Sequence, residues 1–145
     1  MQVRHILGDK GGTVIGIGRE ATLAEAARLL AERRIGALVV RDGKGALSGI
    51  LSERDLVRAL AAAGVGALEQ TVDRHLTRDV VTCRLGDTTE ALMEMMTAGR
   101  FRHLPVLDDN GALCGLVSIG DVVKSRIAET EREAQDLRVY ISATA

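Results

Sequence analysis

The stretch Gly49–Asp55, which reads GILSERD, recurs as GLVSIGD at Gly115–Asp121. In both copies a short apolar run ends in a serine, and an aspartate follows three residues later. Ser-x-x-Asp between a strand and a helix is a capping pattern, in which the serine hydroxyl accepts a backbone amide and the carboxylate lies near the positive helix end. The pattern therefore predicts two strand-to-helix junctions, and it leaves open whether either pair also binds a ligand.

The recurrence extends well beyond these two motifs. Ser52 and Ser118 stand 66 residues apart, as do Asp55 and Asp121. The same offset, without a gap, pairs Val14 with Val80, Thr22 with Thr88, Arg34 with Arg100, Val40 with Val106, Asp42 with Asp108, Gly45 with Gly111, Ala46 with Ala112, Leu47 with Leu113 and Gly49 with Gly115. We therefore expect an internal repeat whose halves, each small for a separate domain, fold together.

Each half is predicted to form a strand, a helix, a strand, a turn, a strand and a helix. In the first half, Thr22 and Glu25 have the form of a capping box that begins a helix. The predicted strands and turn of that half are residues 14–17, 37–40, 42–45 and 46–51. In the second half they are 80–83, 104–107, 108–111 and 112–117, with helices over 89–98 and from 119 onward. These elements predict a mixed α/β fold of the β-α-β-β-α type, repeated twice.

The segments outside the repeats are less regular. Residues 65–75 are polar and follow Gly64, which indicates a linker. Over residues 129–145 we expect a helical tail, because apolar or small residues recur at alternating steps of three and four: Ile127, Thr130, Ala134, Leu137 and Ile141. Such a helix would have a narrow seam for one partner helix. A frayed polar tail is the open alternative.

The composition excludes several classes of protein. The net charge of −1, with both signs interspersed, gives no basic field for nucleic acid or an anionic membrane. No apolar run approaches the roughly 20 residues needed to cross a bilayer. Cys83 and Cys114 form no CxxC motif and no signal segment is visible, so we expect a cytoplasmic protein. No catalytic or metal-binding motif is found, and we expect neither an enzyme nor a metal requirement.

The paired motifs, their spacing and the segment Arg100–Val106 (RFRHLPV) resemble a tandem cystathionine β-synthase (CBS) domain pair, a regulatory unit also called a Bateman module. The resemblance covers about residues 10 to 128, with one repeat at 10–64 and the other at 76–128. It implies pseudo-twofold symmetry, two small sheets packed together with helices outside, and two ligand clefts between the repeats.

The chemistry of the motifs suits a nucleotide, because a helix N-terminus favours phosphate and a carboxylate can accept two hydrogen bonds from a cis-diol. Gly49 and Gly115 are interpreted as leaving room for a ligand near each strand. The resemblance implies an adenine nucleotide such as AMP, ATP or NAD. One implied cleft uses Leu116, Ser118 and Asp121, with Thr13, Ile15, Ile35, Gly36 and Ala37 around the base. The other uses Ile50, Ser52, Arg54 and Asp55, with Val81, Phe101 and Arg102 opposite.

Arg102 and His103 fall where some family members carry phosphate-binding basic residues, although His103 could also be a packing residue. The matching positions of the first repeat, Gly36 and Ala37, carry no charge, so we expect unequal clefts. Two functions stay open: a sensor that signals nucleotide occupancy to an unknown partner, and a scaffold whose task is dimerisation. A homodimer is expected in either case, because apolar stripes continue past each motif: Leu56, Val57, Leu60, Val122 and Val123.

Overall fold

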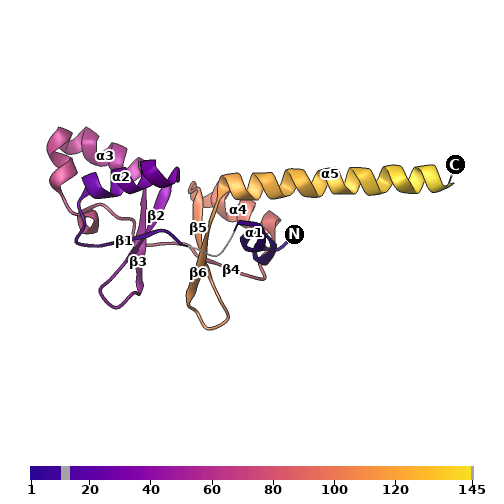
Figure 1. Ribbon diagram of the computed structural model, residues 1–145, viewed down its shortest axis with the longest axis horizontal. Coiled ribbons are helices and arrows are strands. Elements are labelled where there is room, and N and C mark those ends of the chain that lie inside the picture. The colour runs from indigo at the N-terminus through magenta and orange to yellow at the C-terminus, as the bar shows by residue number, and fades with distance from the viewer. Residues whose placement is uncertain (11–13, 145) are drawn as a thin grey trace. The chain divides into compact units, whose positions relative to one another are not determined.

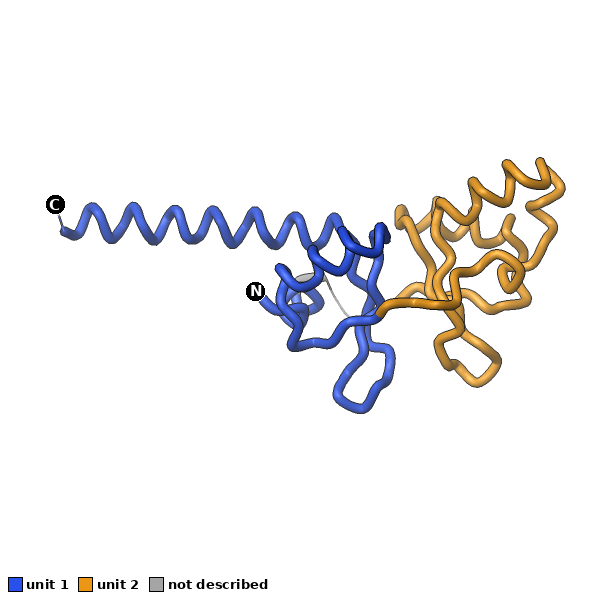
Figure 2. The backbone as a smooth tube through the Cα atoms, turned by 180° about the vertical axis from the view of Figure 1, so that it is seen from behind, with its two compact units in different colours: residues 1–12, 82–145 blue, residues 13–81 orange. Residues whose placement is uncertain are grey.

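The computed structural model describes residues 1–10 and 14–144 and divides the chain into two compact units (Figure 2). Unit 1 comprises residues 1–12 and 82–145, and unit 2 comprises residues 13–81. Unit 2 contains β1 (Gly16–Gly18), α2 (Leu23–Arg33), β2 (Ala37–Arg41), β3 (Leu47–Ser52), α3 (Glu53–Ala63) and the 3₁₀ helices η1 (Gly64–Glu69) and η2 (Val72–Arg74). Unit 1 contains α1 (Val3–Lys10), β4 (Cys83–Arg84), α4 (Thr89–Gly99), β5 (His103–Leu107), β6 (Leu113–Ser118) and α5 (Ile119–Thr144) (Figure 1). The predicted mixed α/β class is confirmed.

Each unit has one three-stranded sheet, and the two sheets share the same topology. The first strand pairs parallel with the second, which pairs antiparallel with the third, in the orders β1-β2-β3 and β4-β5-β6. The registers also agree, since Ala37 lies opposite Ser52 in one sheet and His103 opposite Ser118 in the other. Both hairpins shift register at the equivalent step, after Val40 and after Val106. The repeat that the sequence predicts is therefore present in the backbone.

The first strand of each sheet begins later and is shorter than the sequence predicts. β1 is Gly16–Gly18 where residues 14–17 were expected, and β4 is Cys83–Arg84 where residues 80–83 were expected. Pro105 explains why β4 is the shorter of the two strands. In unit 2 the Val39 N–H donates to the Ile15 carbonyl at 3.2 Å, just before β1 begins. The equivalent of Val39 in unit 1 is Pro105, which has no N–H to donate. The equivalent of Ile15 is Val81, which consequently has no such donor from β5. The strand expected over residues 80–83 is therefore reduced to Cys83–Arg84.

The helix starts follow the sequence closely. Thr22 caps α2 in the predicted capping box, with Thr22 Oγ1 accepting from the Glu25 N–H at 3.2 Å and Glu25 accepting from the Thr22 N–H at 3.3 Å. Thr88 caps α4 by accepting from the Ala91 N–H at 3.1 Å. Ala91 stands where Glu25 stands in the first repeat, so the second half of the box is missing. The two caps confirm the predicted starts of α2 and α4.

The expected linker belongs to the core of unit 2. Ala67, Val72 and Leu76 are buried there, beside the aliphatic residues of α2, β2 and β3. The Val72 N–H donates to the Ala21 carbonyl at 2.8 Å, which ties η2 to the segment before α2. Residues 64–76 therefore act as a structural part of the unit, and the sequence interpretation as a mere connection understates their role.

Unit 1 gains an element for which we predicted nothing. Helix α1 buries Val3, Ile6 and Leu7 in the core formed by β4, β5, β6, α4 and α5. The spacing of three and four residues between these apolar side chains is the signal that would have identified it.

Burial also raises the pKa of the Cys83 thiol in this core to about 12, so Cys83 packs as a small protonated side chain. Among the described residues, no helix combines the length and apolar composition that crossing a membrane requires.

Candidate functional site

The second motif joins β6 to α5 within unit 1. The Ser118 N–H donates to Asp121 Oδ2 at 2.9 Å, and Ser118 Oγ accepts from the Asp121 N–H at 3.1 Å. These reciprocal bonds form a capping box, as the Ser-x-x-Asp pattern predicts. Asp121 is half-buried in the first turn of α5. The motif therefore fixes a carboxylate at the positive end of a long helix, with part of its surface exposed to solvent.

The first motif joins β3 to α3 within unit 2, and its aspartate is more enclosed. The Ser52 N–H donates to Asp55 Oδ2 at 2.8 Å, and Ser52 Oγ lies 3.2 Å from the same oxygen. The other carboxylate oxygen, Oδ1, lies 3.5 Å from the Thr77 hydroxyl. The exposed fraction of Asp55 is only 7%. Both oxygens of Asp55 thus face polar groups of the chain, and little of the carboxylate is accessible.

Thr77 reaches Asp55 because the segment 72–78 pairs with the free edge of β3 through an antiparallel bridge between Ile50 and Thr77. Ile50 and Thr77 exchange backbone hydrogen bonds of 3.0 and 2.8 Å. Asp73 Oδ1 accepts from Arg19 Nε at 2.8 Å and from an Arg78 Nη at 2.9 Å. These hydrogen bonds lower the pKa of Asp73 below its ordinary value, and the one from Arg19 has the larger effect. We call residues 72–78 the cover segment of the first motif.

The glycines before the motifs serve protein packing, so our interpretation of them as room for a ligand was wrong. A Cβ on Gly49 would lie 2.2 Å from the Thr77 carbonyl oxygen and 2.6 Å from Leu76 Cδ1. A Cβ on Gly115 would lie 2.7 Å from Leu7 Cδ2. The obstacle to a side chain differs between the two glycines. At Gly49 it is the backbone of Thr77, whereas at Gly115 it is the end of the flexible Leu7 side chain.

The backbone brings the basic residues of the second repeat beside their own motif. His103 lies opposite Ser118 in the sheet, and the Ile119 N–H donates to the Arg102 carbonyl at 2.8 Å. The side chain of Arg102 is exposed and that of His103 is half-buried. At the first motif the same places hold Ala37, opposite Ser52, and Gly36, whose carbonyl accepts from the Glu53 N–H at 3.0 Å. One motif therefore has cationic or titratable neighbours and the other has none at those positions.

The remaining predicted ligand residues are distributed over both units. In unit 1, Leu116 and Phe101 are half-buried, and Phe101 also packs against the core. In unit 2, Ile15 and Ile35 are half-buried, Ile50 is buried and Arg54 and Val81 are exposed. Thr13 lies outside the described residues. The cleft of the second motif takes its framing residues from unit 2, whereas that of the first motif takes Phe101 and Arg102 from unit 1 but Val81 from the motif's own unit. Both clefts stay predictions.

Thr77 and Leu7 are the residues at the motifs that sequence reasoning missed. Neither has an identical counterpart in the other repeat, since the positions 66 residues away are Gly11 and Asp73. Their contacts with Asp55 and Gly115 join segments distant in sequence, for which the chain carries no local pattern.

Across the described residues, no group of three or more His, Cys, Asp or Glu side chains is arranged to hold a metal ion.

Two such motifs on two equivalent sheets define a tandem-repeat α/β module, and comparison with known proteins identifies its family. The family model described as "CBS domain" matches residues 5–62 and 72–128. The chain therefore belongs to the CBS domain family and carries two CBS domains in tandem.

Two relatives illustrate the match. A solved CBS-domain containing protein from Agrobacterium tumefaciens is 48% identical, with a TM-score of 0.84 over 86% of this chain and 92% of that one. The mitochondrial CBS domain-containing protein CBSX3 of Arabidopsis thaliana is 36% identical over 83% of this chain. The chain spans 60% of the length of this curated relative.

Solved structures of similar pairs include complexes with adenosine compounds. A CBS domain protein from Pyrobaculum aerophilum, complexed with AMP, is 26% identical, with a TM-score of 0.74 over 83% of this chain and 89% of that one. A CBS domain pair in complex with 5′-methylthioadenosine and S-adenosyl-L-methionine is also 26% identical, with a TM-score of 0.75 over 86% of this chain and 98% of that one.

Proposed function

We propose that this CBS pair is a regulatory module that binds an adenine nucleotide and signals its occupancy to a partner protein. The observation that carries the proposal is the half-buried Asp121 carboxylate, held by Ser118 at the start of α5. The complexes of similar pairs with AMP and with other adenosine compounds support an adenosine ligand. AMP, ATP and NAD are the candidates, and the role is regulatory rather than catalytic.

In this proposal, Asp121 accepts hydrogen bonds from the ribose diol, and Ser118 contacts the ribose or the phosphate. The resemblance places Arg102 opposite the first motif, but its backbone lies beside the second one, so we assign its exposed guanidinium to the phosphate of the Asp121 site. A planar set of donors suits that anion. The first motif is the weaker site, since Asp55 is only 7% exposed whereas Asp121 is half-buried. One class of site per chain therefore dominates binding.

Calorimetric titration with AMP and with 5′-methylthioadenosine tests these roles together. Both compounds carry the ribose diol, but only AMP carries a phosphate. Replacing Arg102 by Gln should weaken AMP binding by about tenfold, the loss of one charge-assisted contact, and leave methylthioadenosine binding unchanged. Mass spectrometry of small molecules released from the denatured protein would identify the natural ligand. The proposal fails if neither AMP, ATP, NAD nor methylthioadenosine binds.

A homodimer is also proposed, and the apolar stripes support it in part. Val57 is 66% exposed and Val123 is 43% exposed, as a dimer surface requires. Val122 is fully buried, so our assignment of it to the stripes was wrong. Leu56 is half-buried and packs partly against the core of unit 2. The scaffold function rests on the same exposed residues. A monomeric mass by light scattering, with nucleotide bound, would favour the sensor alone.

A cytoplasmic location is proposed as well. Cys83 and Cys114 are both free thiols, which suits a reducing compartment. Fractionation of cells that produce the protein, with detection by antibody, tests this location.

A further inference from the structure

Helix α5 continues far beyond the elements that support it. Its first turns pack on β6, α4 and α1, whereas every residue from Thr130 to Thr144 is exposed (Figure 1). Isolated helices of about 12–15 residues are marginal in water, because nucleation is costly and burial supplies most helix stability in proteins. The exposed half of α5 therefore needs a partner to persist as a helix.

Six exposed residues of α5, apolar or small, fall on one line, which we call the α5 seam: Val123, Ile127, Thr130, Ala134, Leu137 and Ile141. Ile119, Val139 and Tyr140 are exposed as well but lie outside this line. The steps alternate between four and three residues, which is the spacing of a and d positions in a two-stranded coiled coil. Ile127, Ala134 and Ile141 occupy a positions, and Val123, Thr130 and Leu137 occupy d positions. Ile127, Leu137 and Ile141 are each more than half exposed.

A groove lies at the supported end of the same seam. Val123, Ile127 and Thr130 line it together with Met93 of α4, Arg126 and Glu131, and its volume is about 280 Å³. Three of its six lining residues are seam positions, so the groove and the seam form one continuous apolar surface. A second helix laid along α5 would fill both.

The charges that flank the seam indicate what that second helix is. Arg126 and Glu133 occupy g positions, and Glu131 and Arg138 occupy e positions. In a parallel, in-register pair each g residue meets the e residue five positions later in the other helix. Arg126 then meets Glu131 of the second copy, and Glu133 meets Arg138 of the second copy. Both pairs have opposite charges.

The antiparallel alternative is less favourable. The alignment that pairs the complete seam, with Val123 opposite Ile141 of the second copy, places Lys124 beside Arg138 and Glu131 beside Glu131. Like charges at these positions oppose association. We propose that the α5 seam binds the α5 seam of a second copy of this chain as a parallel, in-register coiled coil.

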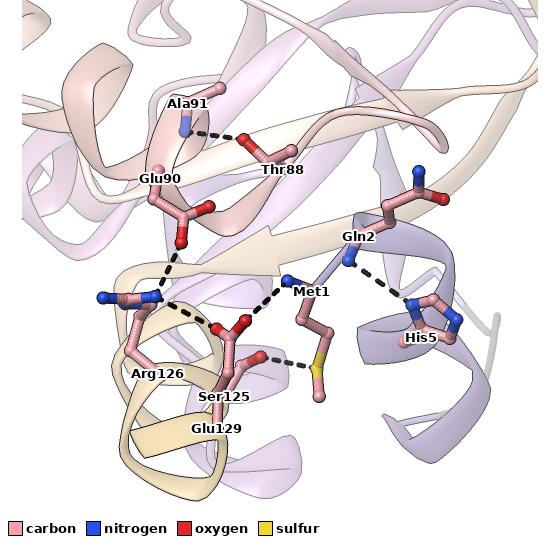
Figure 3. A network of polar contacts seen from close by, with 9 residues as sticks. All are labelled: Met1, Gln2, His5, Thr88, Glu90, Ala91, Ser125, Arg126 and Glu129. Atoms are coloured by element: carbon pink, nitrogen blue, oxygen red, sulfur yellow. Dashed lines mark hydrogen bonds and ion pairs between the residues drawn. The ribbon is translucent and has the colours of Figure 1, made fainter. Parts of the chain in front are cut away.

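Of the two charge pairs, Glu133 with Arg138 gives the cleaner test. Arg126 already contacts Glu90 at 2.6 Å and Glu129 at 3.1 Å within its own chain, in the network that also holds the Met1 amino group (Figure 3). Glu133 and Arg138 both lie on the exposed half of the helix. Reversing the charge of either residue therefore changes the flank of the α5 seam without disturbing the packed part of unit 1.

Engineered cysteines in the full chain test the pairing and its direction. Leu137→Cys stands at a d position, which faces its own counterpart only in the parallel, in-register arrangement. Val139→Cys is the matched control, since Leu137 and Val139 are both 59% exposed but Val139 occupies the outer f position. After mild oxidation we expect most Leu137→Cys chains to run as covalent dimers, and Val139→Cys chains to stay monomeric like the unmodified protein.

Charge reversal provides the second arm. In the Leu137→Cys background, Glu133→Arg should reduce the yield of covalent dimer severalfold, because it places Arg beside Arg138 of the second copy. Adding Arg138→Glu should restore the yield. Equal yields from Leu137→Cys and Val139→Cys, or no covalent dimer from either, would overturn the proposal. Crosslinking of Leu137→Cys only when mixed with Ile127→Cys would overturn the parallel direction. None of these outcomes depends on nucleotide binding.

Discussion

The two Ser-x-x-Asp motifs are nearly the same in sequence, yet the structure places them in different surroundings. Asp55 is buried under the cover segment, with Thr77 beside its second oxygen. Asp121 is half-buried, and Arg102 and His103 lie beside its motif in the sheet. A capping box is therefore common to both repeats, whereas the accessibility of its carboxylate is decided by what packs against it. This comparison separates the structural role of the motif from its proposed role in binding.

The largest difference between the motifs should appear in stability when their glycines are replaced. Gly49→Ala should destabilise the protein by about 3 kcal/mol, because the new Cβ meets the Thr77 carbonyl oxygen and the cover segment must move. Gly115→Ala should cost about 1 kcal/mol or less, since the end of the Leu7 side chain can shift. Urea unfolding of the two variants measures the difference. Equal losses would show that Leu7 is as rigid as backbone.

The next difference should appear in affinity when each aspartate is replaced. Asp121→Asn should weaken AMP binding by about 1.5–3 kcal/mol, roughly ten- to a hundredfold, because a charged acceptor of the ribose diol is lost. Asp55→Asn should change the affinity little, since its carboxylate is covered. Calorimetry with AMP measures both. A larger loss for Asp55→Asn would mean that the buried motif is the principal site and that the cover segment opens.

Replacing each aspartate by alanine should affect stability in the opposite order, with the larger loss at Asp55. Asp55→Ala leaves the Ser52 N–H without its acceptor in a nearly buried site, and it should cost about 2 kcal/mol. Asp121→Ala should cost about 1 kcal/mol, the net value of one hydrogen bond, since the released Ser118 N–H lies in a half-buried site that water can reach. Melting temperatures of the ligand-free proteins compare the two. An equal loss of stability in the two variants would indicate that the deeper burial of Asp55 does not affect the free energy of unfolding.

The smallest effect concerns the ion pairs of the cover segment. Because Arg19 and Arg78 lower the pKa of Asp73, its ionised form is favoured in the folded state. The resulting stability is present above the unfolded pKa, about 3.9, and is lost as the pH falls through the lower folded value. Asp73→Asn should therefore lower the melting temperature slightly at neutral pH and by progressively less below about pH 4. A constant difference across this range would contradict the assignment.

The sequence carries the local features of both units and little of what distinguishes them. The offset of 66 residues, the Thr22 and Thr88 caps and the hairpin turns follow from short-range patterns, and the structure agrees with them. The short β4 was also predictable, because Pro105 replaces the donor that Val39 provides. The contact of Thr77 with Asp55 was not, since Thr77 lies 22 residues away and has no identical counterpart in the other repeat. Residues 72–78 have the polar composition of a linker, so their packing is visible only in three dimensions.

The central claim is that Asp121 accepts the ribose diol, and a nucleotide without the diol tests it most directly. Wild type and Asp121→Asn are each titrated with AMP and with 2′,3′-dideoxyadenosine monophosphate. If both changes remove the same contact, the dideoxy compound binds wild type poorly and loses little more in the variant. The same cycle with Asp55→Asn should show no coupling. Fully additive losses at Asp121 would contradict the account, because they would mean that its carboxylate does not touch the diol.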